Sequence, residues 1–363
     1  MDAAISVASR IAPRSEIDAI VRGMGALDAG IFQLAMARGD LDFNKKLYQS
    51  LVDLSIESGR PITFGSLSRR SMPGQWRVLY DIIEEGNRNG ARIFTQVHSR
   101  EINTMISFET VTPFDTMDVW RDVRALPLEQ QKKALRDPET RRKLIDSATR
   151  ADSGRKAAGA EAKPPVWEYF YVMDRIARPH RSVAEIAKER GVAPIEAMID
   201  LALEHDFKLF FRQPLANEDQ DDALELMKNP NTCVTFSDSG AHVSQIMDSS
   251  LQTHLLSHWV RDKEAFTLEE AVRKITYETS TRWGFHDRGL LREGLAADIV
   301  VLDPDRVAPR MPEVVNDLPA GARRLKQFAD GIKATVVGGE IVLKDNEHTG
   351  ALPGRVLRGP LAA

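Results

Sequence analysis

Three polar residues that could take part in chemistry follow one short hydrophobic segment. In "TCVTFSDSGAHV", the strand-forming run Thr232–Phe236 is followed by Ser237, Asp238 and His242. In parallel α/β proteins the active site lies at the carboxyl ends of the strands, so Asp238 stands where a catalytic carboxylate is expected. Asp238 or Ser239 could equally cap the segment that follows. This stretch alone leaves both interpretations open.

A second polar group ends the segment "IFTQVHSR". Gln96, His98 and Arg100 are spaced two apart, and side chains two apart on a strand point to the same face. His98 could bind a metal or a substrate, and an ordinary hydrogen-bonded histidine is the alternative. Arg100 and Arg212, both near strand ends, could hold a substrate carboxylate by bidentate pairing. A structural ion pair is the competing interpretation for both arginines.

Two further histidines, His254 and His258, lie four residues apart in a predicted helix. This spacing places them on one helix face, as metal sites on helices require. Leu251, Leu255 and Trp259 lie close by, and no acidic residue separates the histidines as in HExxH. The sequence therefore favours a buried packing face here. The chain contains no HxH, CxxC, GxSxG or glycine-rich phosphate loop.

The elements that must position these residues alternate along the chain. Strands are predicted at Ala29–Met36, Pro61–Leu67, Ala91–Val97, Phe207–Arg212 and Thr232–Phe236. Helical patterns lie between them, which indicates βαβ units and a parallel sheet. About eight such units close a (β/α) barrel. The predicted fold class is therefore α/β, with a partial TIM-like barrel of the last five units over residues 1–285.

The alternation breaks between residues 101 and 165. A highly charged helical stretch there is followed by a segment rich in small residues and proline. We expect a solvated surface excursion, and a lid over a site is the alternative.

The chain changes character again after residue 285. A turn is predicted at Glu293-Gly294, a strand at Asp298–Leu302 and a hairpin at Gly338-Gly339. Residues 286–363 are therefore expected to form a small β-sandwich segment.

The composition of the chain bears on its partners and on the compartment in which it is found. The net charge of -4 over 363 residues gives no reason to expect nucleic acid or a membrane surface as a partner. The single cysteine, Cys233, fits a reducing compartment. No apolar run reaches the ~20 residues that span a bilayer, and no clear signal peptide begins the chain. We expect a cytoplasmic protein.

Five motifs, taken in order, resemble a known family. They are "FSDSGAHV", "LLSHWVRD", "TLEEAVRKIT", "DRGLLREGLAADIVVLDPDRV" and "GIKATVVGGEIVLKDNEHTGALPGRVLRG". Together they resemble the C-terminal portion of the amidohydrolase superfamily, in particular its N-acyl-D-amino-acid deacylase branch, amidohydrolase family 3. A weaker match through "ASRIAPRSEIDAI" and "AGIFQLA" extends the resemblance over nearly the whole chain.

The resemblance implies a chemistry. A divalent metal, usually zinc, activates water and polarises the scissile carbonyl of an N-acyl-D-amino acid. An aspartate after the last barrel strand takes the proton and returns it to the leaving nitrogen. Asp238 matches that aspartate, and His242 would bind substrate or orient Asp238. Ser237 would contact the substrate, and His98 is the metal ligand that this chain could offer.

The departures from the family pattern are equally clear. The chain has no HxH pair, and Cys233 does not match the family's cysteine ligand, so the ligand set is incomplete. The simplest expectation is a truncated or split chain whose exposed strand edges are covered by an N-terminal segment or by another copy. Two alternatives stay open: a non-catalytic remnant or partner subunit without the metal centre, and a hydantoinase-like hydrolase of cyclic amides.

Overall fold

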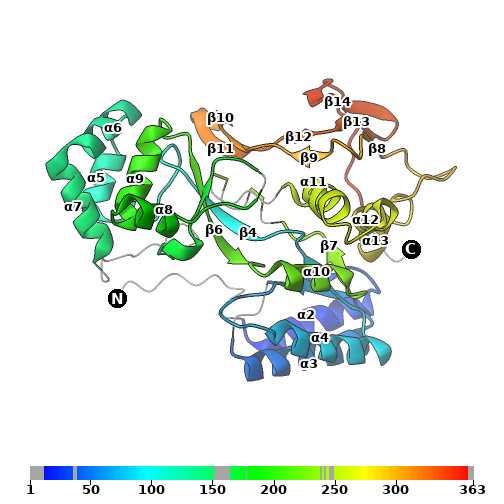
Figure 1. Ribbon diagram of the computed structural model, residues 1–363. Coiled ribbons are helices and arrows are strands. Elements are labelled where there is room, and N and C mark those ends of the chain that lie inside the picture. The colour runs from blue at the N-terminus through cyan, green and yellow to red at the C-terminus, as the bar shows by residue number, and fades with distance from the viewer. Residues whose placement is uncertain are drawn as a thin grey trace.

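The computed structural model describes residues 12–35, 39–150, 164–176, 178–237, 239–240, 243–244 and 249–358. Figure 1 shows a parallel sheet with its helices, a helical group beside a second sheet, and a set of C-terminal strands. Asp238 and His242 fall outside the described residues.

Four parallel strands form the sheet on which the predicted site depends. The order is β1 (Phe32–Leu34), β2 (Ile62–Gly65), β3 (Ile93–Val97) and β7 (Thr232–Val234). All neighbouring pairs are parallel, which confirms four of the five predicted strands as members of one parallel sheet. Every residue of β2, β3 and β7 is buried, as expected for continuous apolar runs. Within the described ranges, β1 pairs only with β2 and β7 only with β3, so this sheet is open.

Three helices pack together against this sheet. They are α2 (Arg14–Ala26), α3 (Leu41–Ser58) and α4 (Gln75–Arg88), drawn in blue and blue-green in Figure 1. Asp40 caps α3 by accepting the Phe43 N–H at 2.8 Å. Gly59 ends the helix with a φ of 69°, a conformation that glycine adopts without strain.

The strand predicted at Phe207–Arg212 does not belong to the parallel sheet. It forms β6 (Phe210–Ala216), which pairs antiparallel with β4 (Ile102–Ile106) and β5 (Tyr171–Met173). The prediction that this strand lies in the same parallel sheet as the other four was therefore wrong. A short apolar run has the same pattern in either kind of buried sheet, so periodicity could not separate them. Phe207 itself lies in a turn with a φ of 68°, and the strand begins only at Phe210.

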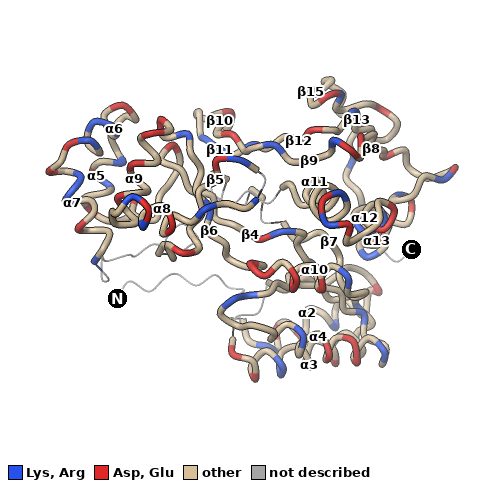
Figure 2. Tube along the Cα trace, viewed as in Figure 1, with Lys and Arg blue, Asp and Glu red and all other residues tan. Residues whose placement is uncertain are grey.

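The stretch after residue 101 contributes core rather than only surface. Its helices α5 (Asp118–Arg124), α6 (Leu128–Arg136) and α7 (Pro138–Thr149) pack with α8 (Val183–Arg190) and α9 (Pro194–Glu204). Phe108, Phe114, Trp120, Leu135 and Leu144 are buried in one cluster with residues of the last two helices. The interpretation as a solvated excursion was therefore wrong for residues 102–149. Charged residues of both signs occur along these helices (Figure 2).

A helical segment follows β7. It consists of α11 (Leu251–His254), the π-helix η3 (Leu255–Asp262), α12 (Leu268–Ile275) and α13 (Tyr277–Arg282). One more helix, α10 (Gln220–Lys228), lies before β7 in the sequence. At the start of α12, the Thr267 hydroxyl accepts the Glu270 N–H at 3.2 Å, and the Glu270 carboxylate accepts the Thr267 N–H at 2.8 Å. This is a reciprocal capping box. No helix in the described ranges is long and apolar enough to cross a membrane.

The C-terminal segment is built from antiparallel strands. One sheet has the order β15 (Glu347–His348), β14 (Glu340–Lys344), β13 (Ile332–Val337) and β8 (Ile299–Leu302). The Gly338-Gly339 turn joins β13 to β14, which confirms the predicted hairpin. Two smaller pairs lie nearby in the sequence: β10 (Glu313–Leu318) with β11 (Ala322–Lys326), and β9 (Ala308–Pro309) with β12 (Ala329–Asp330). Short 3₁₀ turns occur at η2 (Trp167–Tyr169) and η4 (Pro319–Gly321).

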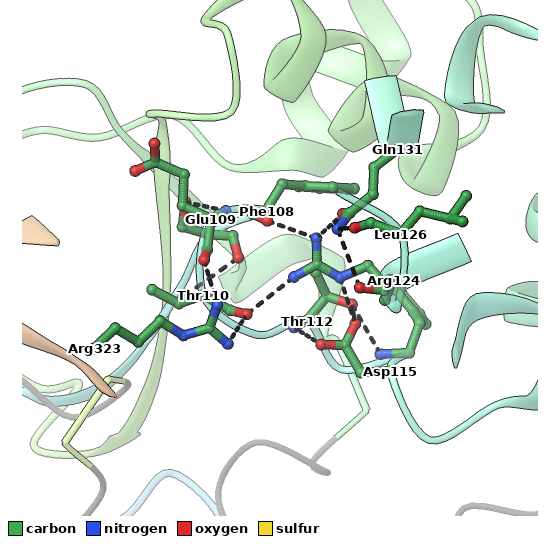
Figure 3. Close-up of polar contacts among 11 residues, drawn as sticks. Phe108, Glu109, Thr110, Thr112, Asp115, Arg124, Leu126, Gln131 and Arg323 are labelled. Carbon is green, nitrogen blue, oxygen red and sulfur yellow. Dashed lines mark hydrogen bonds and ion pairs between the residues drawn. The ribbon is translucent and has the colours of Figure 1, made fainter. Parts of the chain in front are cut away.

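Two arginines, one from the C-terminal segment and one from α5, bind the loop after β4 (Figure 3). Arg323, on β11, donates to the carbonyl oxygens of Glu109 and Thr110 at 2.7 and 2.6 Å. Arg124, on α5, donates to the Thr110 carbonyl at 3.0 Å and to the Asp115 carboxylate at 3.1 Å. The loop is therefore held from both sides by guanidinium groups.

Candidate functional site

The chain that leaves β7 stays beside the end of β3. Val97 and Val234 are register partners, and the Phe236 N–H donates to the Val97 carbonyl at 3.1 Å. The Phe236 ring packs directly over Gly65 at the end of β2, where any Cβ atom would clash with it. Ser237 is exposed, and its hydroxyl accepts the Ser239 N–H at 3.2 Å. The role predicted for Asp238 stays a prediction, because that residue is not among those described.

His98 lies in the turn that follows β3 and is fully buried. Its Nδ1 atom is 3.1 Å from both the N–H and the carbonyl oxygen of Arg100. The Asn217 amide nitrogen lies 3.5 and 3.4 Å from the carbonyl oxygens of His98 and Arg100. Because β3 ends at Val97, the strand alternation predicted to align Gln96, His98 and Arg100 stops short of the last two.

One buried carboxylate, Glu101, sits at the centre of the polar network. Its oxygens pair with Arg178 and, at 3.5 Å, with Arg212. Only 5% of the Glu101 side chain and 7% of the Arg212 side chain are exposed, whereas Arg178 keeps 33% exposed. Arg212 also donates to the Asn103 side chain at 3.2 Å and stacks 4.5 Å from the Tyr171 ring centre. Arg212 thus makes a structural ion pair with Glu101, and its predicted role in binding substrate stays a prediction.

The two arginines that pair with Glu101 have lowered pKa values. Withdrawal from water lowers the pKa of Arg178 to about 9, and repulsion from Arg212 and Arg100 acts in the same direction. Burial lowers the pKa of Arg212 to about 10. Both groups remain protonated at neutral pH. Sequence reasoning named Arg100 and Arg212 but missed Glu101 and Arg178, although Glu101 directly follows Arg100 in the sequence.

His180 connects Arg212 to the surface. Its Nδ1 atom accepts the Arg212 Nε–H at 3.0 Å, so its Nε2 atom carries the proton and donates to the Arg175 carbonyl at 2.8 Å. The other face of His180 lines a cavity of about 310 Å³. Burial and the neighbouring Arg212 charge lower the pKa of His180.

This arrangement predicts a loss of stability on acidification. Between its lowered folded-state pKa and the unfolded value of about 6.5, His180 binds protons more readily in the unfolded chain. Stability should therefore fall as the pH drops below about 6.5, because protonation of Nδ1 also breaks the bond from Arg212. Urea denaturation at pH 7.5 and 5.5 measures the effect. His180→Gln keeps an acceptor without the charge, and a slope as steep as that of the wild type would exclude His180 as its source.

The helix after β7 is fastened to the end of β3. The Ser99 hydroxyl donates to the Leu251 carbonyl at 2.7 Å, and the Trp259 indole N–H donates to the Ser99 carbonyl at 2.6 Å. Leu251, Leu255 and Trp259 are buried, which confirms the predicted packing face for these residues.

The two histidines of this helix differ from its apolar residues in the contacts that they make. The His254 and His258 rings stack with centres 4.8 Å apart and planes 10° apart. The His254 Nε2 atom is buried and has no hydrogen-bond partner. Burial, followed by the charges of Arg100, His258, Arg178 and His98, holds the pKa of His254 well below its usual value. His254 is therefore neutral at the edge of the arginine network.

The described residues do not fit a divalent metal. Among them, no three His, Cys, Asp or Glu side chains come together in a way that could hold one. His98 and His254 lie near the guanidinium groups of Arg100 and Arg178, whose charge opposes a second cation. Cys233 contacts the Thr279 hydroxyl at 3.5 Å, and burial raises the pKa of its thiol.

Comparison with known proteins shows the relationship of this chain. A family model described as "Amidohydrolase family" matches residues 5–343. An uncharacterised protein of Mycobacterium tuberculosis strain H37Rv is 26% identical over 280 residues, covering 70% of this chain and 45% of that protein. D-aminoacylase of Alcaligenes xylosoxydans xylosoxydans is 38% identical over 103 residues, covering 28% of this chain and 19% of the enzyme.

Solved structures show the same fold. A D-aminoacylase mutant in complex with copper chloride matches with a TM-score of 0.53 at 18% identity, over 95% of this chain and 59% of that one. The N-acyl-D-glutamate deacylase of Bordetella bronchiseptica, complexed with zinc and a phosphonate inhibitor, matches with a TM-score of 0.51 at 17% identity, over 92% and 57%. The chain thus spans little more than half the length of these structural relatives.

Proposed function

The chain belongs to the amidohydrolase family, and we propose that it forms part of an active site that hydrolyses the amide bond of N-acyl-D-amino acids. The family match and the likeness to D-aminoacylase and N-acyl-D-aspartate deacylase support this substrate class. The reaction is proposed for the complete active site, because these curated enzymes are matched over 19% of their length.

The observation that carries the proposal is the cluster of arginines beside the end of β3. Glu101 is the carboxylate that pairs with both Arg178 and Arg212, and Arg100 lies near enough to lower the pKa of both arginines. A substrate carboxylate would find complementary charge there. The segment after β7, which contains Asp238, begins beside this network.

The proposed roles come from the family resemblance and from the positions of these residues in the sequence. Asp238 would take a proton from the attacking water and return it to the leaving nitrogen. Ser237 and His242 would contact the substrate from the same segment, while Arg100 and Arg212 would favour its carboxylate end. No step is assigned to a metal, because the described residues do not fit one.

A substrate panel tests this proposal. We expect release of free amino acid from N-acetyl-D-amino acids, with the L-enantiomers cleaved at least about tenfold more slowly, since a positioned carboxylate and amide fix the hand of the substrate. Amine release is measured by derivatisation and chromatography. Cleavage of cyclic ureides in preference to N-acetyl-D-amino acids would instead support the hydantoinase-like alternative.

A second candidate is a non-catalytic binding subunit. The described residues favour it in one respect, since they bring no metal-binding group together. Such a subunit would bind N-acetyl-D-amino acids without turnover, and Asp238→Asn would leave its affinity unchanged. Turnover that depends on Asp238 would exclude this candidate.

A further inference from the structure

We propose that a cavity at the amino ends of β2 and β3 binds a small organic anion with an apolar body, such as an aromatic carboxylate. The cavity has a volume of about 480 Å³, and its lining comes from the starts of these two strands and from α4, α12 and α13. Among the described residues that line it, none was given a role in the proposed hydrolysis. The inference therefore goes beyond that reaction.

The cavity lies at the opposite end of the parallel sheet from the candidate site. Pro61, which precedes the first residue of β2, and Ile93, the first residue of β3, both line it. The candidate site begins beyond Val97, the last residue of β3. Each strand residue rises about 3.3 Å, so about 13 Å of strand separates Ile93 from Val97. The two places on the protein are therefore separate.

The buried residues that line the cavity are apolar. They are Ala91, Ile93 and Phe94. The Phe94 ring is held by an edge-to-face contact with Trp283, whose ring centre lies 5.6 Å away. Tyr277 also lines the cavity and is 37% exposed. An apolar ligand group placed here would remove this surface from water, which favours binding.

Three arginines, Arg92, Arg273 and Arg282, bring positive charge to the same cavity. The carboxylate among the lining residues, Glu278, pairs with Arg273 at 3.2 Å and with Lys274 at 3.6 Å.

Arg92 and Arg282 are engaged differently, because they donate to main-chain carbonyl oxygens. Arg92 donates to the Gly59 carbonyl at 3.2 Å, and Arg282 donates to the Pro230 carbonyl. Within the part of the chain that the structure describes, neither guanidinium forms an ion pair with a carboxylate. A carbonyl group carries no net charge, so it leaves the positive charge of a guanidinium uncompensated. An anion in the cavity would supply that compensation.

The charged and apolar surfaces lie close enough to act on one ligand. The guanidinium carbon of Arg282 is 5.9 Å from the centre of the Phe94 ring, and that of Arg273 is 5.9 Å from the Tyr277 ring centre. A guanidinium group binds a carboxylate through two parallel hydrogen bonds. A purely inorganic anion would leave the apolar surface exposed, and an uncharged molecule would leave the arginines uncompensated. An anion with an apolar body satisfies both.

The wall of the cavity is preorganised by hydrogen bonds. The Asn87 side chain donates to the Ile93 carbonyl at 2.8 Å and accepts the Ile93 N–H at 2.9 Å. The Arg92 N–H donates to the Ser55 hydroxyl at 2.9 Å. The start of β3 is thereby fixed to α4 and α3, and a fixed wall loses little further freedom when a ligand binds.

Isothermal titration calorimetry on the full chain tests the site. The probes are 3-phenylpropanoate, its uncharged amide 3-phenylpropanamide, and inorganic phosphate. We expect 3-phenylpropanoate to bind, and the amide and phosphate to bind at least about tenfold more weakly, because each lacks one of the two features that the cavity recognises. Arg92→Gln and Arg282→Gln should each raise the Kd for 3-phenylpropanoate by about threefold to tenfold, as expected for loss of a partly exposed charge-assisted hydrogen bond.

Arg88→Gln is the matched control. Arg88 is an exposed arginine in the last turn of α4, next to Asn87 in the sequence, and it is not among the residues that line the cavity. Its loss should leave the Kd unchanged. Arg282→Lys, which keeps the charge, should retain part of the affinity. Circular dichroism verifies the folding of each variant, and Arg92→Gln decides the question if Arg282→Gln does not fold.

Three results would overturn the site. They are a Kd that neither Arg92→Gln nor Arg282→Gln changes, equal binding of the amide, and tighter binding of phosphate than of 3-phenylpropanoate. The outcome is independent of the proposed hydrolysis. Binding that depends on these arginines, in a chain that releases no amino acid from N-acetyl-D-amino acids, would support the site and contradict the hydrolysis.

Discussion

Asp238→Asn is expected to lower kcat/KM for N-acetyl-D-amino acids by about 100-fold to 10,000-fold, the usual contribution of a general acid–base. Asparagine cannot take a proton from water, so both proposed proton transfers would be lost. Asparagine is, however, as good a helix N-cap as aspartate. The substitution therefore removes the catalytic role of Asp238 while preserving its alternative role as a cap.

Asp238→Ala completes the comparison. If Asp238 is only a cap, Asp238→Ala should destabilise the chain by about 1 kcal/mol. In that case Asp238→Asn should match the wild type in both stability and activity. Steady-state kinetics and urea denaturation of the two variants measure these quantities. Activity of Asp238→Asn within about twofold of the wild type would remove Asp238 from the mechanism.

Glu101→Gln is expected to lower the free energy of unfolding by about 3 kcal/mol or more, as is usual when one member of a buried ion pair is removed. Glu101 is 5% exposed and faces Arg178 and Arg212, of which Arg212 is also buried. A neutral amide at this position would leave the Arg212 charge inside the protein with weaker compensation. Urea denaturation at pH 7, followed by circular dichroism, measures the change.

Two further variants make this prediction specific. Glu57→Gln removes a carboxylate that pairs with Arg22 at the surface, where more than half of each side chain is exposed, and should cause no measurable change. Glu101→Gln combined with Arg212→Met should recover part of the lost stability, because the uncompensated charge is then removed as well. Equal losses for Glu101→Gln and Glu57→Gln would show that the network does not hold the fold.

The elements that could be predicted were those with local signals. The runs that became β1, β2, β3 and β7 are short, apolar and bounded by helical patterns, so their existence follows from nearby residues alone. The Gly338-Gly339 hairpin depends on only a few adjacent residues.

The elements that could not be predicted depend on long-range pairing. The run that became β6 has the pattern of a buried strand, but its antiparallel partners β4 and β5 come from distant parts of the chain. Trp120 and Leu144 are surrounded by charged residues in the sequence, yet their side chains meet the core. Tertiary packing overrides local composition at such positions.

The candidate site also combines residues that could be predicted from the sequence with residues that could not. Arg100 was recognisable because it follows a predicted strand, whereas Arg178 lies in a loop and is brought to Glu101 only by the fold. His254 was assigned to a packing face because its neighbours are apolar. That assignment describes Leu251 and Leu255 but not the buried nitrogen of His254.

The contact made by Arg323 is of a kind that correlated substitutions in an alignment of related sequences would not reveal. Its guanidinium group donates to main-chain carbonyl oxygens of Glu109 and Thr110, and not to their side chains. Every amino acid supplies the same carbonyl, so a substitution at position 109 or 110 need not remove the contact. Correlated substitution between positions 323 and 109–110 should therefore be weak even if the contact is shared among relatives. A search for co-varying pairs would miss one of the bonds that join the C-terminal strands to the rest of the chain.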